Sequence, residues 1–77
     1  MAARKNESMK TELNRLGGEV RRRRQALRLT QIDFAQGVGI SNKTLDNIEA
    51  GRNWPSLPVY ISILVKFGLK HPPLVAA

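Results

Sequence analysis

TQIDFAQGVGISNKTLDNIEAG, residues 30–51, contains two short helical patterns separated by a single tight turn. Thr30 is a good N-cap for the first helix, and Gly39 can end it because glycine accepts positive φ. Ser41 caps a second helix, which Gly51 ends. Two helices joined in this way form either an ordinary hairpin in a small bundle or the arrangement that places its second helix in a DNA major groove.

The polarity of the second helix favours the latter. On a helical wheel Leu45 and Ile48 face one side, and the opposite face is short, amide-bearing and mildly basic. That outer face consists of Lys43, Asp46, Asn47 and Ala50. Asparagine can pair with adenine, lysine donates to guanine, and aspartate can accept from cytosine. A face that is only solvated would more typically carry long Glu and Lys side chains one turn apart. Asn42, in the first helical turn, is also well placed to meet base edges.

A further helical pattern precedes this stretch. Its apolar residues recur at helical spacing and are Met9, Leu13, Leu16, Val20 and Leu27. Gly17 and Gly18 interrupt the pattern, because adjacent glycines cost about 1 kcal/mol each against alanine inside a helix. We therefore expect a helix over about residues 17–28 that begins or bends at the glycines, and leave open whether residues 9–16 add further turns.

The last helix is expected to have Ser56 as its N-cap, Pro58 in its first turn and Gly68 at its end. Its segment VYISILV is rich in β-branched residues, but no second strand exists to pair with it. The core-facing residues have helical spacing and are Tyr60, Ile63, Leu64 and Phe67. A second apolar stripe on the same helix, called here the α-stripe, consists of Leu57, Ile61 and Val65.

Two interpretations of the α-stripe stay open. In the first, the stripe is covered by other residues of the chain, either Met9 and Leu13 or Leu74 and Val75 from the tail. In the second, it is a subunit interface, because exposed apolar patches mark association sites. Trp54, in the linker before this helix, is expected to pack over the linker rather than to stack on a base.

Length and composition bound the class of protein. Seventy-seven residues allow one compact domain, and without cysteine it has neither a disulfide nor a thiolate metal site. No signal-peptide core and no run of about 20 apolar residues is present, so we expect a soluble cytoplasmic protein without a membrane partner. The one histidine, His71, stands without a nucleophile or carboxylate pair, so we expect no enzyme, no metal site and no cofactor.

The charge is strongly and unevenly positive. Thirteen basic and six acidic residues give +7, and nine of the basic residues lie in residues 1–28 with only three of the acidic ones. Such an excess indicates a polyanionic partner, nucleic acid or an anionic membrane surface, unless the charge serves solubility alone.

LTQIDFAQGVGISNKTLDNIEAGRNWPS, residues 29–56, resembles the phage-repressor-like helix-turn-helix family, also called the XRE or Cro/cI type. The family pattern falls on Thr30-Gln31, Ala35, Gly39, Glu49-Ala50-Gly51 and Pro55. The resemblance covers about residues 20–69 and implies an all-α, compact, four- to five-helix lambda-repressor-like domain. Two departures are Gly37, where the family usually has a longer polar residue, and Phe34, which replaces a frequent Leu. The glycine suggests a weaker end of the first of the two helices.

The resemblance also implies how the chain divides and which residues read bases. We expect a flexible basic segment over residues 1–12, the helix-turn-helix domain over residues 13–69, and a short tail over residues 70–77 that is a candidate for a dimer contact. The family's base-reading positions match Asn42, Lys43 and Asn47, and Thr44 lies among them. Asp46 is different, since a carboxylate near phosphates repels them; it either tunes specificity or points away.

Six residues are expected to contact phosphates. By resemblance, Gln31 anchors the N-terminus of the first of the two helices, where backbone N–H groups and the helix dipole help, and the loop after the second helix touches the DNA backbone. With the two N-caps and one arginine added, the set is Arg28, Thr30, Gln31, Ser41, Arg52 and Asn53.

The run RRRR, residues 21–24, is divided by helix geometry. Arg24 lies within the apolar stripe of its helix, where an unpaired charge is costly. Glu49 likewise lies on an apolar stripe, so we expect an ion pair between them unless Arg24 reaches water past small neighbours. The matching positions of the family often form such a pair. The other three arginines of the run, together with Arg28, are left for phosphates or solvent: Arg21, Arg22, Arg23 and Arg28.

Three functions fit the sequence. The first is a sequence-specific regulator of transcription, a repressor, that inserts residues 41–50 into the major groove of double-stranded DNA as a homodimer. The second is an antitoxin-type protein that binds a small protein partner through the α-stripe and autoregulates its operon. The third is a protein-interaction module that keeps the fold. The expected location is the cytoplasm of a bacterial or phage-infected cell.

Overall fold

The computed structural model describes the backbone of residues 2–69 and the side chains of residues 9–69. Four helices follow one another: α1 (Ala2–Ala26), α2 (Gln31–Val38), α3 (Asn42–Glu49) and α4 (Leu57–Phe67). No strand forms between residues 2 and 69, and the all-α fold class is confirmed. The expectations for the tail, which include His71, Leu74 and Val75, lie outside the described residues.

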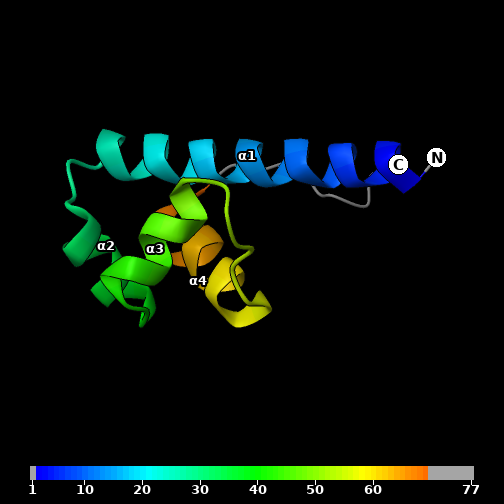
Figure 1. The fold of residues 1–77 in the computed structure, drawn as a ribbon. Helices are drawn as coiled ribbons and strands as arrows, with labels where there is room; N and C mark the ends of the chain where they lie inside the picture. The colour runs from blue at the N-terminus through cyan, green and yellow to red at the C-terminus, as the bar shows by residue number, and fades with distance from the viewer. Residues whose placement is uncertain (1, 70–77) are drawn as a thin grey trace.

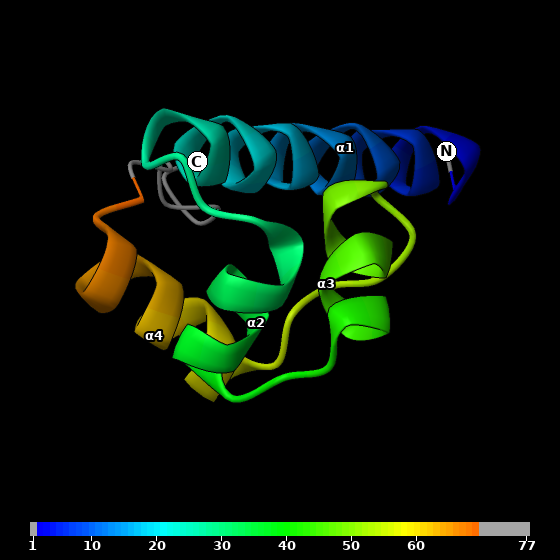
Figure 2. The ribbon, with the colours of Figure 1, turned by 90° about the vertical axis from the view of Figure 1, so that its left-hand side faces the viewer.

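The length of α1 sets the shape of the molecule. Its 25 residues span about 37 Å at a rise of 1.5 Å per residue, close to the longest of the three dimensions, 40 × 23 × 21 Å. The three short helices gather along its C-terminal half, and its N-terminal half projects beyond them (Figure 1). In the view turned by 90°, α2 lies between α3 and α4 (Figure 2).

α1 begins earlier than the sequence predicted, and it is helical through both glycines. Residues 9–16 belong to it, so the expected start or bend at Gly17 and Gly18 is wrong. Gly17 is buried against the end of α3: a Cβ there would lie 2.4 Å from the Ile48 carbonyl oxygen and 2.7 Å from that of Glu49. The glycine therefore serves close helix packing. The division into segments 1–12, 13–69 and 70–77 stays a prediction.

The predicted N-caps are present at all three short helices. Thr30 Oγ1 accepts from the Asp33 N–H at 3.1 Å, Ser41 Oγ from the Thr44 N–H at 3.0 Å, and Ser56 Oγ from the Val59 N–H at 3.4 Å. Each bond satisfies one of the N–H groups that the first turn of a helix leaves without a partner. The segment VYISILV, residues 59–65, is helical, as predicted, and lies within α4.

The core lies between α1 and the three short helices. Its fully buried side chains come from all four helices: Leu16, Val20, Phe34, Leu45, Ile48 and Ile63. Ala35 and Leu69 are buried beside them. Burial from every helix fixes α2 and α3 relative to each other, which positions the candidate interface described below.

One contact accounts for both departures from the family pattern. The Phe34 ring stacks on that of Phe67 in α4, with centroids 4.2 Å apart. Gly37 gives the Phe67 ring room, because a Cβ at this position would lie 2.6 Å from its Cζ atom. Despite the glycine, α2 continues to Val38, and Lys66 Nζ donates to the Gly37 carbonyl at 2.8 Å. The end of α2 is therefore held by α4.

Candidate nucleic-acid interface

α3 is anchored by its apolar side and leaves its polar side open. Leu45 and Ile48 are buried in the core. The side chains expected to read bases follow the open side: Asn42, Lys43 and Thr44 are exposed, and Asn47 is half-buried. Ser41 Oγ lies 2.8 Å from Thr44 Oγ1, so this hydroxyl pair closes the N-terminal turn. An ammonium group, two amides and a hydroxyl are thus carried by one short helix on a rigid support.

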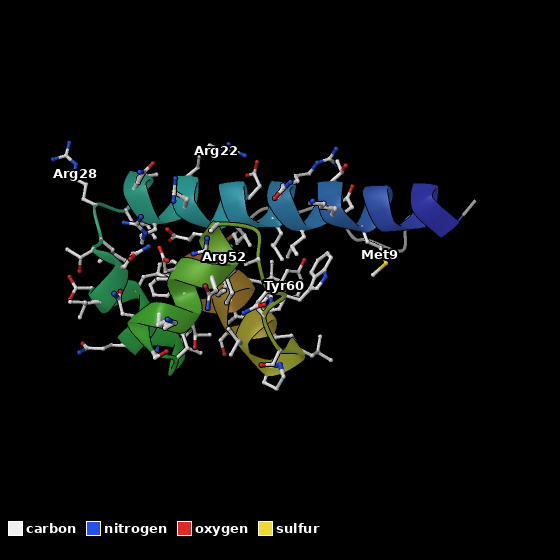
Figure 3. All side chains as sticks on the ribbon, in the orientation of Figure 1. Met9, Arg22, Arg28, Arg52 and Tyr60 are labelled. Carbon is white, nitrogen blue, oxygen red and sulfur yellow. The ribbon has the colours of Figure 1, made fainter. Side chains whose placement is uncertain are left out.

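The expected phosphate contacts lie at the N-termini of α2 and α3 and in the adjacent loops. Arg28, Arg52 and Asn53 are exposed, and Arg28 extends away from the helices (Figure 3). Arg28 has a φ of 58° in the turn that ends α1, a left-handed conformation that costs an L-residue roughly 1–2 kcal/mol. Glycine would adopt this backbone conformation at lower cost than the arginine that occupies it. Arg28 lies a short way along the chain from the N-terminus of α2.

Gln31 has protein partners. Its Nε2 donates to Glu49 Oε1 at 3.1 Å and to Asp46 Oδ1 at 3.3 Å. The amide that the sequence assigned to a phosphate therefore links α2 to α3 within the molecule. To contact a phosphate through Nε2 it has to give up or share these hydrogen bonds, and its role as a phosphate anchor stays a prediction.

The ion pair expected between Arg24 and Glu49 is present. Arg24 Nε donates to Glu49 Oε2 at 2.7 Å and Nη2 to Oε1 at 3.1 Å, while Nη1 donates to the Leu29 carbonyl at 3.0 Å. The Glu49 side chain is 0% exposed and that of Arg24 14%. The hydrogen bonds that Arg24 donates to Glu49 raise the pKa of Arg24, burial lowers it, and the negative charge of Glu49 raises it. The pair ties α1 and the turn after it to α3.

Glu49 receives more than the one predicted partner. Arg21 Nε lies 3.6 Å from Glu49 Oε1, the oxygen that also accepts from Gln31. The sequence assigned Arg21 to phosphates or solvent, and its side chain is partly exposed while turned toward this carboxylate. Glu49 therefore gathers donors from α1 and α2 at one buried point on α3.

Asp46 belongs to a second group of contacts that the sequence did not predict. Arg52 Nη2 lies 3.1 Å from Asp46 Oδ2, and Arg52 Nε donates to Asn47 Oδ1 at 3.0 Å. One oxygen of Asp46 meets Gln31 and the other meets Arg52. The turn at Gly51 brings Arg52 back over the end of α3. A wheel of α3 alone contains no signal for this contact.

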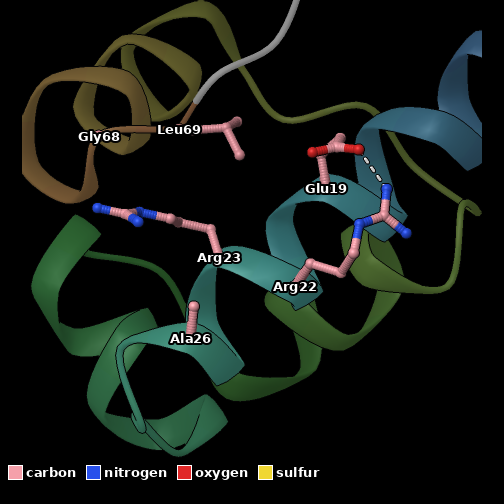
Figure 4. Close-up of a pocket in the computed structure, with 6 residues that line it drawn as sticks. All are labelled: Glu19, Arg22, Arg23, Ala26, Gly68 and Leu69. Carbon is pink, nitrogen blue, oxygen red and sulfur yellow. Dashed lines mark hydrogen bonds and ion pairs between the residues drawn. The ribbon is translucent and has the colours of Figure 1, made fainter.

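Arg22 and Arg23 have roles other than phosphate contact in this structure. Arg22 pairs with Glu19 on the side of α1 away from α3 (Figures 3 and 4). Arg23 Nε donates to the Phe67 carbonyl at 2.6 Å, where a cation stabilises the C-terminus of α4. The sequence did not predict this partner of Arg23. Both arginines line a pocket of about 450 Å³ with Glu19, Ala26, Gly68 and Leu69.

The α-stripe is exposed along α4. The exposed fractions are 68% for Leu57, 48% for Ile61 and 79% for Val65. Met9 is itself exposed, so it does not cover the stripe. Trp54 is 38% exposed and lines a small apolar pocket of about 240 Å³ with Leu16, Pro55, Leu57 and Tyr60.

A family model described as helix-turn-helix matches residues 20–74 of the chain. The match contains α2, the turn, α3 and α4, and it begins within α1 just before the arginine run. A search of curated proteins gave no match. Across the residues that the structure describes, no helix is both long and apolar enough to span a membrane, and no group of three or more His, Cys, Asp and Glu side chains could hold a metal ion.

Proposed function

Since the chain belongs to the helix-turn-helix family of the XRE, Cro/cI-like type, whose members are DNA-binding regulators and not enzymes, we propose that it is a dimeric repressor that reads a specific duplex sequence. One observation carries the proposal: α3 buries Leu45 and Ile48 and presents Asn42 and Lys43 on its open, N-terminal side. Those are the donor and amide groups that distinguish base pairs in the major groove.

In this mechanism α3 enters the major groove with its N-terminus forward. Lys43 donates to guanine O6 and N7, and Asn42 and Asn47 pair with adenine. Thr44 lies between them and contacts an adjacent base or methyl group. Base-edge contacts of this kind each contribute about 1–3 kcal/mol of discrimination.

Phosphate contacts fix the register of α3 in the groove. The proposed set combines helix N-termini with flanking side chains and consists of Arg28, Thr30, Gln31, Ser41, Arg52 and Asn53. Backbone N–H groups and helix dipoles at the starts of α2 and α3 favour the negative charge. Each phosphate neutralised by a cation steepens the dependence of log K on log salt concentration by about 0.9. The strained backbone of Arg28 supports a role for its side chain, since glycine would relieve the strain.

We propose that two copies associate through the α-stripe. A two-fold dimer would read a pseudo-palindrome whose half-sites lie about 34–36 Å apart, one turn of duplex. Occupying such an operator blocks transcription that starts there, which is why repression is proposed rather than activation. A regulator of this family acts where the chromosome or phage DNA is, in the cytoplasm of a bacterial or phage-infected cell.

Selection of bound sites from random duplex DNA, at a stated salt concentration, tests the function. We expect an enriched half-site of a few base pairs, repeated with two-fold symmetry. Asn47→Ala should lower affinity for that site about 10-fold or more, because one base contact is lost. Gln36→Ala removes an exposed amide near the end of α2 and serves as the matched control. No enrichment by the wild-type protein would contradict the proposal.

The exposed α-stripe also supports a second candidate, an antitoxin-type protein with a small protein partner and secondary DNA binding. In that case a small protein should copurify in stoichiometric amount from the native host. A third possibility, an interaction module that only keeps the fold, would leave duplex affinity unchanged in Asn47→Ala. The selection experiment and the copurification therefore separate the three.

A further inference from the structure

Asp46 contacts two of the six side chains that the proposed function assigns to phosphates, Gln31 on α2 and Arg52 after α3. Its Oδ1 lies 3.3 Å from Gln31 Nε2, and its Oδ2 lies 3.1 Å from Arg52 Nη2. The Asp46 side chain is 48% exposed and that of Arg52 60%. A phosphate that approaches Arg52 therefore meets a guanidinium group that already has an anionic partner.

The same guanidinium group orients a base-reading side chain. Arg52 Nε donates to Asn47 Oδ1 at 3.0 Å, so Arg52 is shared between a carboxylate and an amide of α3. A carbonyl oxygen has a second lone pair, and Nδ2 is the donor end of the amide. Asn47 is thus held in one orientation while it keeps an acceptor site and a donor for a base.

Glu49, the other acid beside Gln31, cannot have the same effect on DNA. Its side chain is fully buried and paired with Arg24. Asp46 lies on the exposed side of α3, where a carboxylate repels phosphates and competes for the guanidinium groups that bind them. Its effect is therefore expected on DNA binding more than on folding.

Resting on the proposed function, we propose that Asp46 is a positioning residue that holds Gln31, Arg52 and, through Arg52, Asn47, and that competes with DNA phosphate for Arg52. On a non-cognate duplex, phosphate contacts are the whole of binding, so this competition weakens it. On the cognate site, correctly oriented base contacts offset the competition. Asp46 thereby raises discrimination, as a repulsive group at an interface does when it penalises the wrong partner more than the right one.

The test is Asp46→Asn in the full chain, because asparagine keeps the shape and loses the charge. Affinities are measured for the selected site and for an unrelated duplex over a series of salt concentrations. On the unrelated duplex we expect the log K against log salt slope to steepen by about 0.9, one extra phosphate contact, and the affinity to rise several-fold. The ratio of cognate to unrelated affinity should fall roughly 10-fold, which corresponds to about 1.4 kcal/mol.

Glu19→Gln is the matched control. It removes one negative charge and releases Arg22, but on the side of α1 away from α3 (Figure 3). Equal changes in slope and ratio for the two variants would overturn the proposal, because they would reflect net charge alone. An unchanged ratio in Asp46→Asn would overturn it as well.

A measurement without DNA tests the holding role separately. The ¹⁵N and ¹H chemical shifts of Arg52 Nε–H and of the Gln31 side-chain amide should differ from those of the wild type in Asp46→Asn. In Glu19→Gln the same chemical shifts should equal those of the wild type. Unmoved signals contradict the holding role. A wild-type protein that prefers no sequence would overturn the proposed function, and with it the competition. A wild-type protein that discriminates, with an unaltered slope in Asp46→Asn, would overturn only the present inference.

Discussion

At the scale of the residue, Glu49 is the most constrained acid among the described side chains. Its side chain has no exposed surface, and Arg24 meets both of its oxygens. Burying two charges is costly unless their hydrogen bonds are satisfied, and here the third guanidinium nitrogen also has a partner, the Leu29 carbonyl. Pairing raises the pKa of Arg24. The contribution of this pKa shift to stability is present below the ordinary arginine pKa and is lost as the pH rises through the higher folded value.

Arg24→Ala should lower the free energy of unfolding by about 3 kcal/mol, because it leaves the Glu49 carboxylate buried without its main partner. The value is placed at the lower end of the range for a broken buried pair, since Arg21 and Gln31 still reach Glu49. Urea denaturation followed by circular dichroism measures the change.

Arg22→Ala is the control, since it removes a neighbouring arginine from the exposed pair with Glu19. An exposed pair contributes under about 1 kcal/mol, so this variant should denature close to the wild type. Equal stability of Arg24→Ala and Arg22→Ala would show that the buried pair contributes little.

At the scale of the element, the two adjacent glycines of α1 have opposite environments. A Cβ on Gly17 would overlap backbone carbonyls of α3, whereas one on Gly18 would meet only the guanidinium of Arg22 at 3.5 Å. Gly17→Ala should lower the free energy of unfolding by about 1–3 kcal/mol, because α1 has to move off α3. Gly18→Ala should raise it by up to about 1 kcal/mol through helix propensity. Thermal denaturation of the two variants checks the sign, and a stabilised Gly17→Ala would contradict the packing argument.

The sequence predicted the features that depend on neighbouring residues and missed those that depend on contacts between distant elements. The N-caps at Thr30, Ser41 and Ser56 depend on residues within one turn, so local patterns located them correctly. The Arg24 to Glu49 pair could be inferred because each charge interrupts an apolar stripe. By contrast, the requirement for Gly17 comes from carbonyls of a helix distant in sequence, and no local pattern encodes it.

In the candidate site, too, local features were predicted and contacts between distant elements were not. A helical wheel predicted the open face of α3, and the resemblance to the family assigned the base-reading candidates on it. The contacts of Asp46 with Arg52, and of Arg23 with the Phe67 carbonyl, depend on how a turn folds back and how α4 docks on α1. These contacts changed the assignment of individual arginines without changing the fold class.

At the scale of the whole molecule, the α-stripe lies on α4, and the proposed DNA-reading face lies on α3. The proposed association through α4 therefore does not use the residues proposed to read bases. The three stripe residues are more exposed than the core-facing side of α4, of which Ile63 is fully buried. A stable interface buries roughly 800 Å² per partner, so neighbouring side chains such as Trp54 and Pro58 would have to join the stripe.

Ile61→Lys places a charge in the middle of the α-stripe, and an unpaired charge in an apolar interface is costly. The variant should therefore shift the protein from dimer to monomer, as measured by sedimentation equilibrium without DNA. It should also weaken binding to a two-half-site duplex far more than to a single half-site. Ile32→Lys is the matched control, since Ile32 is an isoleucine of similar exposure, 56% against 48%, on α2. A wild-type protein that sediments as a monomer at high concentration would contradict dimerisation and leave each copy to bind its half-site alone. Equal association of the two variants would contradict association through this stripe.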